Sequence, residues 1–300
     1  MSSVDTKGGA PSPLFSGISS KKVFISSEIV VITAIMALVT YYHLVLDGPL
    51  NLWIYAIPAI GFVLAMMDSS MGMGYGTIGT PFLIVLGFSS KLVVPSILLS
   101  QAVAALVASM LHQQQRNVNY FDLHGNDIGI VLRLIVFGVL GVIIAMLVEI
   151  QISKVLLNTY IGCLVISMGL LLLSRPRLTF SWLKVSILSL ISGFNKAISG
   201  GGYGPVATTG LLVSGNPLKN SVGATLLSVT MINTTAFIGW ALTKSFASLE
   251  LPIFLVIGVL LGSQVGPSIT KRASSLGAKV VFACLAIIMG AMTIISTFIK

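Results

Sequence analysis

The sequence predicts an all-α polytopic membrane protein, and three observations carry this prediction. Hydrophobic residues make up 55% of the chain, and the mean hydropathy is +1.02. Only 8% of the residues are charged, whereas an ordinary soluble domain carries about 25%. Apolar runs of about 18 residues or more, long enough to cross the hydrocarbon core as helices, recur through most of the chain. A soluble surface cannot be covered with so few charges.

The N-terminal region is expected to hold a polar tail and one helix. Residues 1–20 are polar and rich in Ser, Gly and Pro, which predicts disorder. Lys21 and Lys22 then precede an apolar run from Val23 to Leu46, which is longer than the hydrophobic region of a signal peptide and has no small-residue cleavage site after it. We therefore predict a first transmembrane helix within residues 21–50.

A glycine-rich segment occurs twice in the chain. It reads MGMGYGTIG at residues 71–79 and SGGGYG at residues 199–204. When the sequence is shifted by 128 positions, 13 of the 29 residues from Gly72 to Ser100 are identical to their counterparts. An internal duplication explains this match. We predict repeat 1 over residues 51–178 and repeat 2 over residues 179–300.

Each glycine segment is followed by an apolar stretch that is too short to cross a membrane, Pro81–Leu86 in repeat 1 and Pro205–Val213 in repeat 2. This pattern predicts a broken helix that forms a re-entrant hairpin, in which a longer helix enters the membrane and a shorter one leaves on the same side. Each repeat is then one hairpin followed by three transmembrane helices. An odd number of crossings makes the two repeats inverted, as in many secondary transporters. If the glycine segments were surface loops instead, the repeats would be parallel.

Membrane orientation follows from the positive charges. With the N-terminus in the cytoplasm, ten Lys and Arg residues fall on the inside and four on the outside, which satisfies the positive-inside rule. Those on the inside are Lys21, Lys22, Arg116, Arg175, Arg177, Lys184, Lys219, Lys271, Arg272 and Lys279. The formal charge of +9 is spread between apolar runs, so it does not predict binding to nucleic acid.

The short helices are expected to begin inside the membrane, near Thr77–Pro81 and Pro205–Thr209. Such a helix N-terminus attracts anions, because it presents unpaired backbone N–H groups and the positive end of the helix dipole. Asp68 and Lys196 lie beside the two breaks and are also 128 positions apart. Ionisable residues at this depth are usually functional. Lys196 is predicted to counter the charge of a bound anion, and Asp68 to carry protons or to pair with Lys196.

The predicted substrate-binding residues lie around the two glycine segments. They are Gly74, Tyr75, Gly76, Thr77 and Thr80 at the first, and Asn195, Lys196, Ser199, Gly200, Gly201, Gly202, Tyr203, Gly204 and Thr208 at the second. Two alternatives remain open: the glycines only permit close helix packing, or the two charges lie in interfacial water or form a structural pair. His112, beside the predicted loop around Arg116, is expected to be an interfacial residue.

Enzyme chemistry is not predicted. The sequence has no GxSxG or HExxH motif and no paired carboxylates within its apolar segments. No cofactor and no metal site are predicted either, because the two cysteines lie apart, without CxxC or His-rich surroundings.

Three segments of the sequence resemble the sulfite exporter TauE/SafE family. They are GGGYGP at residues 200–205, GMGYG at residues 72–76 and KNSVGATLLS at residues 219–228, and the likeness extends from residue 50 to nearly the end of the chain. The resemblance implies a permease for sulfite, organosulfonates or related sulfur oxyanions that works as an exporter driven by the proton gradient. Met73 interrupts the glycine run of the first copy, so equal roles for the two halves are not implied.

The function predicted from these observations is secondary active transport of small sulfur-containing anions across the cytoplasmic (inner) membrane, with protons as the coupling ion. A passive anion channel is the alternative, because anion pores also use helix dipoles and lysines. Only a coupled transporter moves its substrate against a gradient. A membrane-bound assembly partner is a further alternative, and it would not be stabilised by any sulfur oxyanion.

Overall fold

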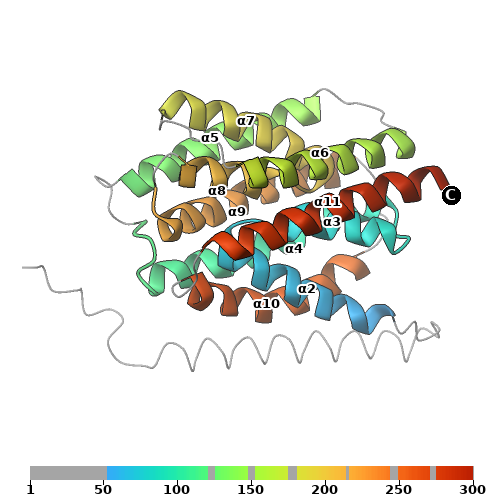
Figure 1. The fold of residues 1–300 in the computed structure, drawn as a ribbon, viewed down its shortest axis with the longest axis horizontal. Helices are drawn as coiled ribbons and strands as arrows, with labels where there is room; N and C mark the ends of the chain where they lie inside the picture. Colours follow the sequence, from blue (N-terminus) through green and yellow to red (C-terminus); the bar gives the residue numbers. More distant parts are fainter. Residues whose placement is uncertain are drawn as a thin grey trace, which may run out of the picture. The chain divides into compact units, whose positions relative to one another are not determined.

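The computed structural model describes residues 53–120, 126–147, 153–174, 181–213, 216–243, 249–270 and 275–299. The polar tail predicted for residues 1–20 and the helix predicted for residues 21–50 lie outside these residues. Within the described ranges the regular secondary structure is entirely α-helical (Figure 1). The helices are α2 (Trp53–Met71), α3 (Tyr75–Val85), α4 (Ser90–Gln114), α5 (Asn126–Leu147), α6 (Lys154–Ser174), α7 (Trp182–Ser199), α8 (Tyr203–Val213), α9 (Leu218–Thr243), α10 (Glu250–Thr270) and α11 (Ser275–Ile299).

The helix boundaries recur at the spacing of the sequence duplication. α3 and α8 have 11 residues each, and Tyr203 and Val213 lie 128 positions after Tyr75 and Val85. The ends of α2 and α7, at Met71 and Ser199, show the same spacing. α2, α3 and α4 therefore have counterparts in α7, α8 and α9.

The first helix of each half packs against a helix of the other half. α2 packs against α10, and its counterpart α7 packs against α5. A methyl group placed on Gly258 of α10 would lie 2.7 Å from the backbone nitrogen of Phe62, and one on Gly141 of α5 would lie 2.8 Å from that of Phe194. Small residues therefore allow both pairs of helix backbones to approach closely, as is common inside membranes.

Counterpart helices that touch run in opposite directions. Gly162 of α6 lies against Gly290 of α11, and Gly169, about two turns further along α6, lies against the earlier Ala283. Val118, just after α4, lies against Gly223 near the start of α9. α6 and α11 are thus antiparallel, and the end of α4 meets the beginning of α9.

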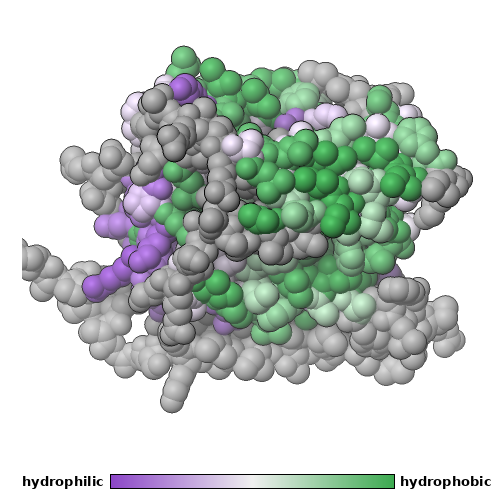
Figure 2. Space-filling view, in the orientation of Figure 1, coloured by the Kyte–Doolittle hydropathy of each residue, from purple (hydrophilic) through white to green (hydrophobic). Residues whose placement is uncertain are grey.

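The outer surface is apolar where it faces away from the other helices. Figure 2 shows a broad hydrophobic face over α6 and α11, with hydrophilic residues gathered near one end of the bundle. Large apolar side chains of these two helices are exposed, among them Leu156 at 58%, Leu170 at 55% and Ile295 at 55%. In the described residues, four helices are long and apolar enough to cross a membrane by length and composition, namely α4, α5, α9 and α10. The chain is therefore an integral membrane protein.

Candidate functional site

Two short glycine bends separate the paired helices. Gly72 and Gly74 lie between α2 and α3 and have φ angles of 67° and 118°, while Gly200 and Gly202 lie between α7 and α8 with φ angles of 71° and 85°. Residues that carry a Cβ atom rarely adopt these φ angles, which explains why glycine stands at these four positions. The prediction that α3 and α8 begin near Thr77–Pro81 and Pro205–Thr209 was wrong. Both helices begin at a tyrosine directly after the bend, because the chain needs only the glycines to turn.

The two bends lie directly against each other. A methyl group on Gly76 would overlap the Gly200 carbonyl oxygen and lie 2.7 Å from the Nζ atom of Lys196. The equivalent contact in the other direction joins Gly204 to Gly72, and a methyl group on Gly204 would also lie 2.8 Å from the Cα atom of Met73. The structure thus brings the two glycine segments together, and their backbones leave no space for an anion at these contacts.

The charged residues predicted for this site lie beside the bends and are buried. Asp68 in the last turn of α2 is 2% exposed, and Lys196 in the last turn of α7 is 2% exposed. Gln101 of α4 lies between them and is 4% exposed. Charges at such depth are costly unless they are paired and hydrogen-bonded, so the hydrogen bonds of these three residues decide what the site can do.

Gln101 joins the two charged groups. Its Nε2 atom donates to Oδ2 of Asp68 at 2.8 Å, and its Oε1 atom accepts a hydrogen bond from Nζ of Lys196. This orientation of the amide is the one that satisfies both neighbours, because a carboxylate only accepts and an ammonium only donates. Lys196 also donates to the Gly200 carbonyl oxygen at 2.6 Å. The ion pair expected between Asp68 and Lys196 is replaced by a pair bridged through Gln101.

Gln101 was missed from the sequence. It lies in an apolar part of α4, and its counterpart in the second half is Val229. Comparison of the two copies therefore does not single out Gln101 as a site residue. The available signal was the amide itself, because Gln is costly to bury in a membrane helix without partners. Ser96 and Ser100 lie close by in the same helix, and nothing in the sequence singled out Gln101 among these polar residues.

The two breaks differ at the start of the short helix. The Oδ1 atom of Asp68 lies 3.5 Å from the backbone nitrogen of Tyr75, which donates to it at the N-terminus of α3. The protein's own carboxylate therefore occupies the anion-attracting end of α3. At the second break the equivalent residue is Lys196, whose ammonium donates to the Gly200 carbonyl at the end of α7 and lies beside Gly76 in the first turn of α3.

The hydroxyl groups of the two predicted tyrosines point away from the bends. Tyr75 donates to Ser100 Oγ on α4 at 2.8 Å, and Tyr203 shares a hydrogen bond of 2.8 Å with Ser189 on α7. Both side chains are buried. These tyrosines thus anchor α3 and α8 to neighbouring helices, and only their backbones belong to the site.

Asn195 and Ser199 are also engaged in local contacts. Asn195 accepts a hydrogen bond from the hydroxyl of Tyr160 on α6. The hydroxyl of Ser199 donates to the Asn195 carbonyl at 2.8 Å and accepts from the backbone nitrogen of Gly201 at 3.1 Å. Both residues shape the end of α7, and neither reaches the charged cluster.

The predicted threonines lie between the two hairpins. Thr77 accepts a hydrogen bond from the backbone nitrogen of Gly202 at 3.3 Å, and Thr208 donates to the Gly72 carbonyl at 2.9 Å. Each of these threonines therefore links one hairpin to the bend of the other. The hydroxyl of Thr80 is buried and has no hydrogen-bond partner among the described residues.

His112, for which an interfacial position was predicted, is fully buried among the helices. Its Nε2 atom lies 2.9 Å from the Ser69 carbonyl at the end of α2. The counterpart of His112 is Trp240, whose indole N–H donates at 2.7 Å to Ala197, the counterpart of Ser69. The same carbonyl is therefore held by a ring N–H in each half, and this contact keeps the last turns of α2 and α7 in place.

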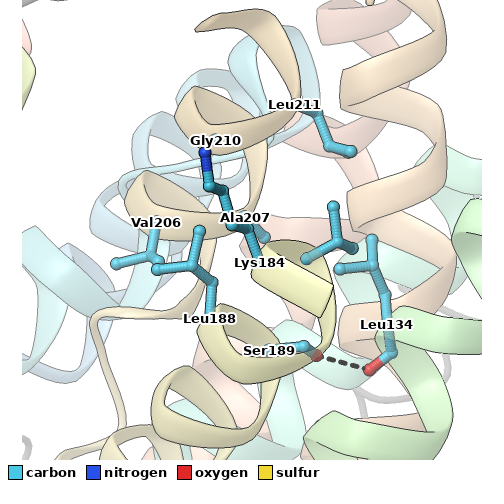
Figure 3. A pocket seen from close by; sticks show the side chains of 9 residues that line it. Leu134, Lys184, Leu188, Ser189, Val206, Ala207, Gly210 and Leu211 are labelled. Carbon is cyan, nitrogen blue, oxygen red and sulfur yellow. Dashed lines mark hydrogen bonds between the residues drawn. The ribbon is translucent and has the colours of Figure 1, made fainter. Parts of the chain in front are cut away.

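A pocket lies beside the second hairpin and is lined by residues of α5, α7 and α8 (Figure 3). Its lining is mostly apolar, including Leu134, Leu188 and Val206. At one place it includes Ser189, the hydrogen-bond partner of Tyr203. Lys184 extends along the pocket toward Gly210 in Figure 3. The pocket thus borders α8, but Asp68, Gln101 and Lys196 are not among the residues that line it.

Comparison with known proteins gives one family and one curated relative. The family model described as "Sulfite exporter TauE/SafE" matches residues 57–293. The relative is described as "Probable membrane transporter protein YtnM" of Bacillus subtilis (strain 168), and it is 27% identical over 199 residues. This alignment covers 60% of the present chain and 64% of the relative. No solved structure matches the chain.

Proposed function

Because the chain belongs to the sulfite exporter TauE/SafE family, we propose that it is a secondary active transporter that exports small sulfur-containing anions, such as sulfite or organosulfonates, across the cytoplasmic membrane. The family is one of membrane transporters, and the apolar outer helices are consistent with that class. Its members carry out transport rather than catalysis, which also argues against an enzyme.

Inverted repeats are part of this proposal. The support is that α6 and α11, which occupy corresponding places in the two halves, run antiparallel, and that the end of α4 meets the beginning of its counterpart α9. Two broken hairpins meeting at their bends are the arrangement in which many secondary transporters hold their substrate. Rocking of one half against the other would separate Gly76 from Gly200 and open the site to one side at a time.

The observation that carries the proposal is the buried ammonium group of Lys196 beside the second bend. A cation and the N-terminus of α8 together favour an anion at this position. The amides of Gly200, Gly201 and Gly202 donate within the protein in the state seen here, so they would bind the anion only after these contacts open. The first bend offers amides at residues 74–80, but Asp68 already accepts from Tyr75 there. We therefore assign the charge of the bound anion to the second bend, with the first bend completing the site from the opposite side.

Asp68 is the proposed proton carrier. It is a buried carboxylate joined to Lys196 through Gln101, so a change in its charge alters the surroundings of the cation that holds the anion. Proton uptake and anion binding would then be linked through one hydrogen-bonded bridge. The pocket beside α8 is proposed as part of the path from the cytoplasm, because Lys184 is predicted to lie on that side.

The test is transport by purified protein in sealed vesicles. With sulfite on both sides at equal concentration, an imposed pH gradient should drive a net movement of sulfite against its developing gradient, and Lys196→Met should abolish it. Lys91→Met is the matched control, because Lys91 is an exposed lysine at the start of α4. A passive channel would only equilibrate sulfite, and wild-type rates from Lys196→Met would remove Lys196 from the site.

A further inference from the structure

Two equivalent threonines make different hydrogen bonds. Thr80 in α3 and Thr208 in α8 are 128 positions apart and both are 0% exposed. Thr208 donates to the Gly72 carbonyl of the opposite bend at 2.9 Å. The counterpart of that oxygen is the Gly200 carbonyl, yet Thr80 has no hydrogen-bond partner in the part of the chain that the structure describes. A buried hydroxyl without a partner is uncommon and needs a physical explanation.

The Thr80 hydroxyl is nevertheless placed as its counterpart is. A methyl group on Gly200 would lie 3.0 Å from Thr80 Oγ1, and one on Gly72 would lie 2.7 Å from Thr208 Oγ1. The same methyl groups would lie 3.5 Å from the Cα atom of Val94 at Gly200 and 3.3 Å from the Cα atom of its counterpart Val222 at Gly72. Thr80 thus has the surroundings needed to reach the Gly200 carbonyl.

Lys196 donates to the carbonyl oxygen that Thr80 would need as its acceptor. Its Nζ atom donates to the Gly200 carbonyl at 2.6 Å. The counterpart of Lys196 is Asp68, which cannot donate in this way when it is ionised, and so Thr208 meets no competitor at Gly72. The hydroxyl of Thr208 also lies 3.1 Å from Thr225 Oγ1, whereas the counterpart of Thr225 beside Thr80 is Ile97. Two differences between the copies, at Lys196 and at Thr225, therefore separate the bonded threonine from the unbonded one.

We propose that the Gly200 carbonyl is held by two donors in turn: by Lys196 in the state seen here, and by Thr80 after Lys196 has turned to a bound anion. The anion-bound half of this exchange rests on the function proposed above. When the ammonium leaves, the carbonyl would otherwise stay buried without a donor, which is costly. Thr80 provides the replacement, and the second bend then has the same hydrogen bond that Thr208 makes at the first bend.

The exchange predicts a coupling between Thr80 and Lys196 that needs no ligand. In the wild-type background, Thr80→Val should leave the melting temperature of the detergent-purified full chain within about 1 °C, because the lost hydroxyl makes no hydrogen bond. In an Asp68→Leu/Lys196→Met background, in which neither position carries a side-chain donor, Thr80 becomes the donor to Gly200, and Thr80→Val should lower the melting temperature by about 2–4 °C. The double background removes both charges, so that neither is left buried alone.

Thr208→Val is the matched control for this experiment. Its bond to Gly72 does not involve Lys196, so Thr208→Val should lower the melting temperature by a similar amount in both backgrounds. Equal effects of Thr80→Val in the two backgrounds would overturn the exchange. This comparison is decided without any anion and is therefore independent of whether sulfite is the substrate.

A second measurement keeps the exchange testable if the double background does not fold. Sulfite is titrated into the wild type, Thr80→Val and Thr293→Val, and binding is followed by calorimetry. Thr293 is a buried threonine that bonds the Met289 carbonyl within α11, so it serves as the control outside the site. Thr80→Val should weaken binding by about tenfold, because the released carbonyl stays unpaired, while Thr293→Val should change it less than about twofold. Equal sulfite affinity of wild type and Thr80→Val would contradict the exchange. If the wild type does not bind sulfite, the anion half and the proposed substrate fail together, and the thermal cycle alone decides the exchange of donors.

Discussion

The two breaks are copies of one segment, but their charges are opposite. At the first, Asp68 places a carboxylate at the N-terminus of α3. At the second, Lys196 occupies the equivalent position and donates to the bend that precedes α8. The backbone contacts of the bends are the same in both directions, since Gly76 meets Gly200 and Gly204 meets Gly72. The duplication therefore supplies the scaffold, and divergence at a few side chains gives its two halves opposite charges, which is the asymmetry that the proposed anion site uses.

The largest expected effect comes from breaking the symmetric backbone contact. Gly76→Ala would place a methyl group onto the Gly200 carbonyl and beside Lys196. Because the opposing atoms are largely backbone and cannot move aside cheaply, we expect a loss of about 3 kcal/mol or more in stability. Thermal unfolding in detergent measures this loss. Gly204→Ala should be equally harmful if the two bends are equivalent in packing.

Gly129→Ala is the control for this pair. A methyl group on Gly129 would meet only the ring of Trp182, at 3.6 Å, which is ordinary van der Waals contact. Since Ala also favours a helix over Gly, this variant should be neutral or slightly stabilising. A Gly76→Ala protein as stable as Gly129→Ala would show that the bends do not touch as described.

The second prediction separates the two opposite charges. Lys196→Met leaves the buried Asp68 without its cation and should cost about 3 kcal/mol, and Asp68→Asn should cost a similar amount by isolating Lys196. The double variant should be more stable than either single variant, because no uncompensated charge remains. A double-mutant cycle of thermal unfolding measures the coupling. Additive losses would mean that the Gln101 bridge does not link the two groups energetically.

These charges also sharpen the functional contrast between the breaks. In vesicles, Asp68→Asn should still bind sulfite but should lose its response to an imposed pH gradient, whereas Lys196→Met should lose sulfite binding itself. Binding is measured by calorimetry and the pH response by sulfite flux. The same defect in both variants would argue against separate roles for the two breaks.

Much of this comparison could be predicted from sequence, for reasons that are local. Glycine runs, short apolar stretches and a fixed spacing of 128 positions located the breaks and the two charged residues. The starts of α3 and α8 were missed, because the prolines Pro81 and Pro205 suggested helix starts, while the positive φ angles at the glycines alone complete the turn. Local signals thus indicate where the chain breaks, but not at which residue the next helix begins.

The bridge through Gln101 could not be predicted in the same way. Gln101 meets Asp68 across 33 positions and Lys196 across 95 positions, and no period in the sequence relates these residues. The unpaired hydroxyl of Thr80 could not be predicted either, since in our proposal it results from competition with Lys196 for the Gly200 carbonyl. Contacts of this kind depend on how α2, α4 and α7 pack in three dimensions.

A third, smaller effect is expected at this bridge. Gln101→Met keeps the length of the side chain but removes one hydrogen bond from each charged group, and it should cost about 2 kcal/mol. Gln115→Met is the control, because Gln115 is only partly buried and makes a solvent-exposed hydrogen bond with Ser268 at 3.2 Å. The difference between the two melting temperatures measures the bridge. If Gln101→Met proved as mild as its control, Asp68 and Lys196 would be satisfied without the amide.

The smallest expected effect concerns the ring N–H groups that hold the ends of α2 and α7. Trp240→Phe removes the donor to the Ala197 carbonyl and should cost about 1–2 kcal/mol, because that carbonyl stays buried. At the first break, His112→Gln keeps an N–H near the position of Nε2 and should cost less than His112→Leu, which removes the donor to Ser69. Thermal unfolding of the three variants tests whether the hydrogen bonds of His112 and Trp240 stabilise the two halves equally. Because the indole cannot take up a proton near neutral pH, equivalence of the two sites means that His112 acts as a structural donor, which leaves Asp68 as the residue whose protonation distinguishes the two breaks.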